Sequence, residues 1–184
     1  GIQLMYGAYA GYSEQVANTS VPSGWIPGAQ TALLARQLQG MREGGTFVLA
    51  APPNPYRCPP GPYERAALMT EWFMKHNPRA KVILVDPKDS FVTDETMMLG
   101  WNRLYNFNLP EDYAKRMSAQ VEIKQHATPG MMSWVRGKDG GAQCPDRALL
   151  SEQRPGIQSA PRACRPDAGA DLEVAQRLAQ DVGD

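Results

Sequence analysis

Long hydrophobic runs, an excess of charge of one sign and paired cysteines are all lacking in this 184-residue chain. No window approaches the roughly 20 apolar residues of a transmembrane helix, so the sequence predicts no membrane span. Its 19 basic and 19 acidic residues give a formal net charge of zero, which leaves no electrostatic footprint for nucleic acid. Three cysteines without a C-x-x-C pair cannot close a disulfide framework, and the distant His76 and His126 indicate no metal site.

An initiator methionine, a basic leader and an apolar leader segment are also missing. Gly1-Ile2-Gln3 reads like a chain already under way, so we expect a fragment of a longer protein. The missing leader therefore says little about location.

The first two thirds of the chain carry the secondary-structure signal. Apolar residues at helical spacing predict a helix over 29–41, and Pro62 suits the first turn of a second helix that runs to His76. Short apolar runs at 46–51 and 81–85 are typical of buried parallel strands. Strand, helix and strand in this order predict a βαβ unit over residues 44–92.

Further along, the sequence predicts helices over 93–104 and 110–117, strands over 121–124 and 131–135, and a turn at 137–141. The chain divides into a loop-like lead (1–27), a central domain (28–141) and a tail (142–184). The tail has no aromatic residue, and we expect it to pack poorly apart from a short helix at 172–178.

The loop between the first strand and the second helix lies where nucleotide-binding folds cradle pyrophosphate. Residues 52–62 contain six prolines instead of a glycine fingerprint, and proline offers no N–H group to a phosphate. We therefore expect no NAD site. Asp86 ends the second strand where an acidic residue could hold a ribose, although a cap of an ordinary turn is the favoured interpretation.

Cys58 is the residue of this loop that carries chemistry. It precedes the helix that begins near Pro62, where the helix dipole favours a thiolate, and Arg57 and Arg65 could add to the effect. A buried, inert cysteine is the common alternative for a lone thiol. Its place on a scaffold-held loop favours a functional thiol.

Three stretches resemble the central domain of the flavin-binding subunit of flavocytochrome c sulfide dehydrogenase. The strongest is the cysteine loop, Ala51-Pro52-Pro53-Asn54-Pro55-Tyr56-Arg57-Cys58-Pro59-Pro60-Gly61-Pro62-Tyr63-Glu64-Arg65-Ala66. The others are Gly28 to Leu34 with Gly44 to Val48, and Lys81 to Asp89 with Gly100-Trp101 and Pro129 to Val135. The resemblance covers roughly residues 1–141.

This resemblance implies a Rossmann-like, three-layer α/β domain from a flavoprotein with two dinucleotide-binding domains. FAD is the expected cofactor, with most of its site outside this chain. In the family, the cysteine that matches Cys58 forms a redox-active disulfide over the flavin with a cysteine much nearer the C-terminus. Tyr56, Arg57 and Pro59 are expected to face the flavin.

The implied activity is oxidation of sulfide or polysulfide, with electrons passing through FAD to a c-type cytochrome subunit in the periplasm. The fragment alone is expected to be inactive. Residues 105–128 look longer than the family pattern, which suggests a surface insertion, and the tail after Gly141 reads like a frameshift. Cys144 and Cys164 have no family context and receive no role.

Two other functions stay open at this point. The proline loop with Tyr56 and Tyr63 could be a docking surface without flavin or chemistry. A nicotinamide-dependent reductase is disfavoured by the proline loop. The four tryptophans, at 25, 72, 101 and 134, are expected to pack in the core or at an interface.

Overall fold

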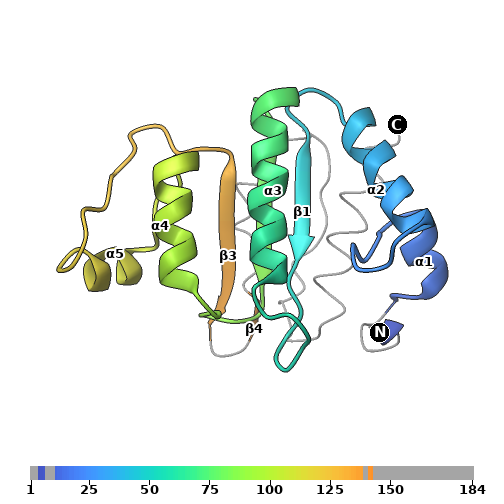
Figure 1. Cartoon of the computed structure of the whole chain (residues 1–184), viewed down its shortest axis with the longest axis horizontal. Helices are drawn as coiled ribbons and strands as arrows, with labels where there is room; N and C mark the ends of the chain where they lie inside the picture. Colours follow the sequence, from blue (N-terminus) through green and yellow to red (C-terminus); the bar gives the residue numbers. More distant parts are fainter. Residues whose placement is uncertain (1–3, 7–10, 139–140, 143–184) are drawn as a thin grey trace, which may run out of the picture. The chain divides into compact units, whose positions relative to one another are not determined.

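The computed structural model of the chain describes residues 4–6, 11–138 and 141–142. This part of the chain is an α/β structure whose small sheet contains three parallel strands. Figure 1 shows helix α3 beside strand β1. The predicted α/β, Rossmann-like class is confirmed. From residue 143 onward the predicted tail, with Cys144, Cys164 and the helix at 172–178, lies outside the described residues.

The predicted βαβ unit is present. Strand β1 spans Thr46–Ala50, helix α3 spans Gly61–His76 and strand β2 spans Lys81–Asp86. Helix α3 has a proline in its first turn, an acidic residue there and two basic residues in its last turn. These charges complement the helix dipole at both ends, which is why the helix begins and ends close to the predicted residues.

The two strands of this unit differ in burial. From Val82 to Asp86, β2 is buried without a break, as predicted. The prediction of a buried strand is wrong for β1, which is half-buried over Thr46–Leu49 and exposed at Ala50. Within the described residues, the strand order β1-β2-β3-β4 places β1 at the end of the sheet, with β2 as its one neighbouring strand.

The later elements are helix α4 (Asp94–Tyr105), helix α5 (Glu111–Met117), strand β3 (Met132–Lys138) and the short strand β4 (Gly141–Ala142). Strands β3 and β4 pair antiparallel, in register at Gly137 with Ala142 and at Lys138 with Gly141. This hairpin stands at the predicted turn, of which residues 139–140 lie outside the described part of the chain.

The strand predicted over residues 121–124 is wrong, because this segment has no strand partner in the described structure. Its backbone is bonded to a side chain instead. The buried Asn102 accepts the N–H of Lys124 at 3.2 Å and donates to the carbonyl of Lys124 at 2.8 Å.

The lead before residue 28 contains a helix that the sequence pattern did not reveal. Helix α1 spans Glu14–Thr19, and the hydroxyl of Ser13 caps it by accepting the N–H of Val16 at 3.2 Å. Helix α2 spans Ala29–Gly40, close to its predicted range. The side chain of the buried Gln30 of α2 forms hydrogen bonds to four atoms of the lead (residues 1–27). These are Tyr6 Oη, Asn18 Oδ1, Ser23 N and Ser23 Oγ.

Contacts group the chain into two compact units. The first unit comprises residues 1–42, 85–89 and 135–184, and in it α1 packs against α2. The second comprises residues 43–84 and 90–134, and in it α3 packs against β1 and α4. The division at residues 27 and 141 stays a prediction. Among the described helices, none combines the length and apolar character needed to cross a bilayer.

Candidate functional site

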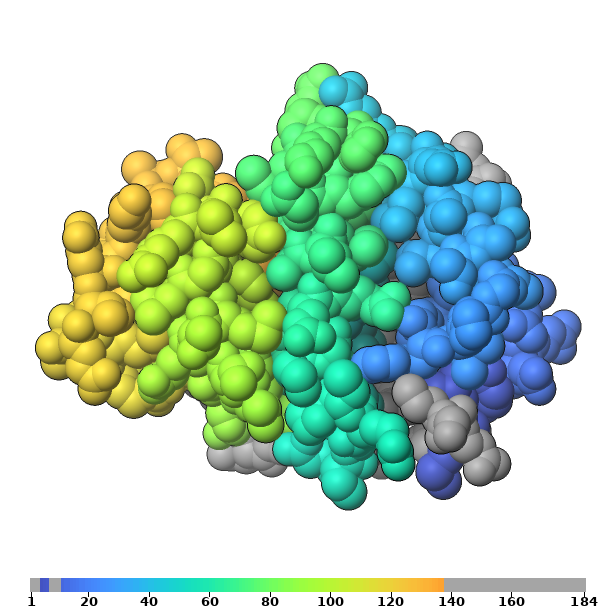
Figure 2. All heavy atoms as spheres, viewed as in Figure 1, coloured from blue at the N-terminus to red at the C-terminus, as the bar shows by residue number. Residues whose placement is uncertain are grey.

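The loop between β1 and α3 is a tight turn stabilised by its own residues. The phenol of Tyr56 donates to the carbonyl of Pro59 at 2.6 Å, and the N–H of Gly61 donates to the carbonyl of Cys58 at 2.9 Å. The Asn54–Pro55 peptide bond is cis. Because each proline fixes its own φ, little conformational freedom is left between these bonds. The loop lies at the lower end of α3, where its atoms are open on the face shown in Figure 2.

Cys58 is exposed and carries a free thiol. Its φ of 59° places it in the left-handed region, which costs an ordinary residue about 1–2 kcal/mol. Residues held in such backbone conformations cluster at functional sites. The alternative of a buried cysteine is therefore wrong, and the reactivity of the exposed thiol stays a prediction.

The three residues predicted to face a cofactor lie next to Cys58 in the same turn. Tyr56 is half-buried, and its hydroxyl is bonded to the loop itself. Arg57 and Pro59 are exposed. Their contact with a flavin stays a prediction, for which the exposure of Arg57 and Pro59 leaves room. Arg65, one turn further on, is half-buried.

The N-terminus of α3 offers no cradle for a phosphate. Of its first N–H groups, that of Gly61 is bonded to Cys58, and those of Tyr63 and Glu64 are both bonded to the carbonyl of Pro60. Pro62 has none. A pyrophosphate needs such groups to be available, so the geometry supports the argument made from the proline content.

Asp86 is completely buried at the end of β2. Its carboxylate accepts the backbone N–H of Lys88 at 3.0 Å and forms an ion pair with the ammonium of Lys88 at 2.6 Å. Lys88 itself has only 10% of its side chain exposed. The favoured interpretation, a strand-end acid that caps a turn, is confirmed.

Tyr63 takes no part in a surface. It is fully buried and stacks on Phe91 with ring centroids 3.5 Å apart. This removes one of the two tyrosines from the predicted docking surface. Of the four tryptophans, Trp101 and Trp134 are buried and Trp25 and Trp72 are half-buried. In the described part of the chain, no group of three or more His, Cys, Asp or Glu could hold a metal ion.

One cluster in the second unit was not found by sequence reasoning. Tyr113 of α5 donates a hydrogen bond to Asp94 of α4 and lies against Trp134 of β3. These residues come from three elements and have no common spacing. No local sequence pattern therefore indicates that these residues lie together.

A family model described as sulfide dehydrogenase (flavocytochrome c) flavoprotein chain, central, matches residues 31–139, more than half of the chain. The chain belongs to this family. The sulfide dehydrogenase match includes the whole βαβ unit and the Cys58 loop, and it extends to the end of β3. The resemblance seen in the sequence is confirmed.

Membership in the sulfide dehydrogenase flavoprotein family makes the protein an oxidoreductase flavoprotein with a flavin cofactor. The name of the family also implies a cytochrome as the partner in the complex. The match runs through residues 105–128 and leaves open whether they are an insertion.

Proposed function

We propose that this chain is the central domain of an FAD-dependent sulfide:cytochrome c oxidoreductase in which Cys58 handles the sulfur of the substrate. Family membership supports the flavoprotein part of this proposal. The observation that carries the role of Cys58 is its exposed thiol, held in left-handed backbone on a proline-stiffened loop inside the matched region. The domain alone is expected to be inactive.

The loop around Cys58 suits the ring system of a flavin but not the pyrophosphate of FAD. Prolines and occupied N–H groups leave no place for the pyrophosphate of FAD at the start of α3. An exposed thiol beside Arg57 and Pro59 does fit the edge or face of a ring system that approaches from outside the loop. We infer that the phosphates of FAD are held elsewhere and that no nicotinamide cofactor is used.

Cys58 would act as one half of a disulfide with a second cysteine that lies outside this 184-residue chain. Attack of HS⁻ on the sulfur of Cys58 breaks the disulfide, forms a persulfide on Cys58 and releases the second cysteine as a thiolate. Over a full cycle, HS⁻ yields elemental sulfur, one proton and two electrons. When bound, FAD would supply the acceptor for these two electrons, and a c-type cytochrome is the expected final acceptor. Polysulfide is the expected alternative substrate, and the periplasm is the expected location.

The test is Cys58→Ser in the intact flavoprotein with its cytochrome. Serine keeps the size of the side chain and removes the thiolate. Sulfide-dependent reduction of the cytochrome should fall by about 10³-fold or more, as for the loss of other covalent nucleophiles. The flavin absorption spectrum should keep its intensity, because the loop does not hold the phosphates.

Cys144→Ser is the matched control, since Cys144 lies outside the matched residues. It should leave the rate of cytochrome reduction unchanged. Reduction at the parental rate by Cys58→Ser would remove Cys58 from the mechanism. That result would favour the non-catalytic docking function.

A further inference from the structure

A line of aromatic rings leads away from the Cys58 loop through the second unit. Tyr63, in the first turns of α3, stacks on Phe91 with an interplanar angle of 9°. Phe91 meets Trp134 edge to face at 5.4 Å, and Trp134 meets Tyr113 at 5.8 Å between ring centroids. Neighbouring rings in this line are therefore in contact from the helix that follows Cys58 to the inner face of α5.

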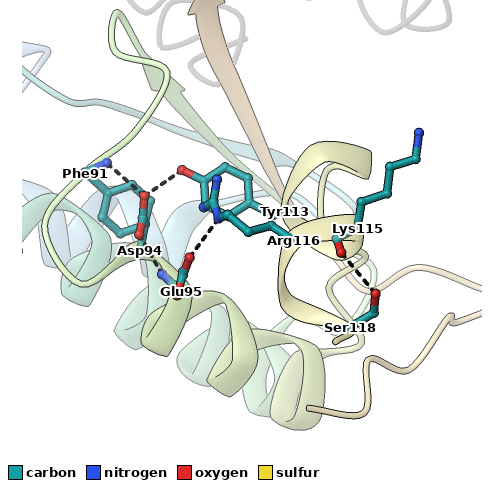
Figure 3. A network of polar contacts seen from close by, with 7 residues as sticks. All are labelled: Phe91, Asp94, Glu95, Tyr113, Lys115, Arg116 and Ser118. Atoms are coloured by element: carbon teal, nitrogen blue, oxygen red, sulfur yellow. Dashed lines mark hydrogen bonds and ion pairs between the residues drawn. The ribbon is translucent and has the colours of Figure 1, made fainter. Parts of the chain in front are cut away.

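The line ends at a tyrosine with a carboxylate partner. Tyr113 is 2% exposed, and its hydroxyl donates to Oδ2 of Asp94 at 2.6 Å (Figure 3). The guanidinium of Arg116 lies 4.3 Å from the centre of the Tyr113 ring and bonds to Glu95 at 2.8 Å. The backbone N–H of Phe91 also points to Asp94, at 3.4 Å. Asp94 thus bonds to two members of the aromatic line, Phe91 and Tyr113.

Packing alone does not require this arrangement. A phenylalanine would fill the same space without a buried hydroxyl that needs a partner. Burial, and then the hydrogen bond to Asp94, raise the pKa of Tyr113, so the phenol stays protonated. A protonated phenol within 2.6–3.2 Å of a carboxylate can lose its proton directly to that group, so it can give up an electron without creating a buried charge.

We propose that Tyr113, with Trp134 and Asp94, is an electron-donor site that repairs one-electron-oxidised sulfur at Cys58. The proposal rests on the sulfur-handling role proposed for Cys58. Because the thiol of Cys58 is exposed, a one-electron oxidant formed from sulfide and air can take an electron from its thiolate and leave a thiyl radical.

The repair step balances as follows. The thiyl radical of Cys58 gains one electron and becomes a thiolate. Tyr113 loses that electron and becomes a neutral phenoxyl radical, while its proton moves to Oδ2 of Asp94. Trp134, Phe91 and Tyr63 lie between Tyr113 and the helix that follows Cys58, and no atom other than this proton changes place.

The experiment places a photo-oxidant at the site of the sulfur. In the full chain, Cys144→Ser and Cys164→Ser leave Cys58 as the single attachment point for a thiol-reactive ruthenium complex. A laser flash with an electron acceptor then generates the oxidant. Electron paramagnetic resonance and transient absorption should show a neutral tyrosyl radical, and Tyr113→Phe should abolish most of it.

Two more variants test the parts of the site. Asp94→Asn removes the proton acceptor and should slow formation of the radical by about 10²-fold. Trp134→Phe keeps an aromatic ring and should delay the radical without abolishing it. Tyr105→Phe is the matched control, because Tyr105 is a half-buried tyrosine of the same unit outside the aromatic line, and it should change nothing.

An unchanged radical in Tyr113→Phe, a radical lost in Tyr105→Phe, or no tyrosyl radical at all would overturn the proposal. If Tyr113→Phe does not fold by near-ultraviolet circular dichroism, the rate in Asp94→Asn decides. In the intact enzyme, Tyr113→Phe should start at the parental rate and then accumulate sulfinic acid at Cys58 under sulfide and air. An intact enzyme that does not oxidise sulfide would refute the proposed function and leave the photochemical result standing.

Discussion

The loop over residues 51–60 and the segment over residues 121–130 have equally little regular structure, yet they are held in opposite ways. Prolines and two short-range hydrogen bonds shape the first. The second is held by hydrogen bonds to side-chain amides from other parts of the chain. Asn102 bonds both backbone groups of Lys124, and Asn108 bonds both backbone groups of His126, at 2.8–3.2 Å.

This difference separates two uses of irregular backbone. The amides of Asn102 and Asn108 replace the strand partner that residues 124 and 126 lack, so this segment depends on groups far away in sequence. The Cys58 loop depends on its own covalent stiffness and leaves its thiol exposed. Substitutions of the supporting residues Asn102 and Asn108 should therefore reduce the free energy of unfolding. Substitutions in the Cys58 loop should change it little.

The largest expected effect is at Gly130, the end of the supported segment. Its N–H donates to the carbonyl of Asn106, and a Cβ there would overlap the carbonyl oxygen of Tyr105. Gly130→Ala should therefore reduce the free energy of unfolding by about 4 kcal/mol, because backbone has to move. Urea denaturation measures this.

Gly100→Ala is the control for the same substitution. Gly100 lies inside α4, and a Cβ there would meet nothing within 4 Å. Alanine should stabilise the helix by up to about 1 kcal/mol. If both variants shift the urea midpoint in the same direction, the close approach at Gly130 is not the cause.

The next effect concerns the buried amide. Asn102→Ala leaves the carbonyls of Phe107 and Lys124 and the N–H of Lys124 without these bonds, at a side chain only 1% exposed. The expected loss is about 3 kcal/mol. Asn108→Ala should cost about 1 kcal/mol, because this half-buried site admits water in place of the amide. Equal losses in the two variants would show that burial does not set the cost.

The smallest effect is expected at Cys58. Glycine adopts its left-handed backbone without steric cost, so Cys58→Gly should raise the free energy of unfolding by about 1 kcal/mol. Cys58→Ala keeps the strained backbone and should give no gain in the same denaturation experiment. A gain in Cys58→Ala would mean that the thiol, and not the backbone, is unfavourable.

The strand predicted over residues 121–124 is wrong because the prediction used only the local sequence pattern. Val121 and Ile123 alternate with Glu122 and Lys124 as in a strand, and the alternation of burial is real. The partner that satisfies the backbone is an amide 22 positions away, which no local pattern reveals. Helix α1 was missed for a related reason, since only Ala17 of its residues is buried and no apolar stripe exists.

The βαβ unit was predictable because its signals are local: apolar runs, a helix-starting proline and charges at both helix ends. The position of Cys58 in the loop before the second helix was predictable in the same way, whereas its exposure required the structure. Its left-handed backbone was not predictable, because that conformation is uncommon outside glycine and leaves no mark in the sequence. The contacts of Tyr63 and Tyr113 depend on which elements meet, so they required the structure.

The buried pair of Asp86 and Lys88 is an obstacle to dinucleotide binding by this domain. A path toward dinucleotide binding, by evolution or by design, would have to free the Asp86 carboxylate and replace the proline loop. Losing Lys88 first would leave a wholly buried carboxylate without the ammonium 2.6 Å away, at a cost of about 3–5 kcal/mol. A variant that loses Lys88 first is therefore destabilised before it can bind a new ligand.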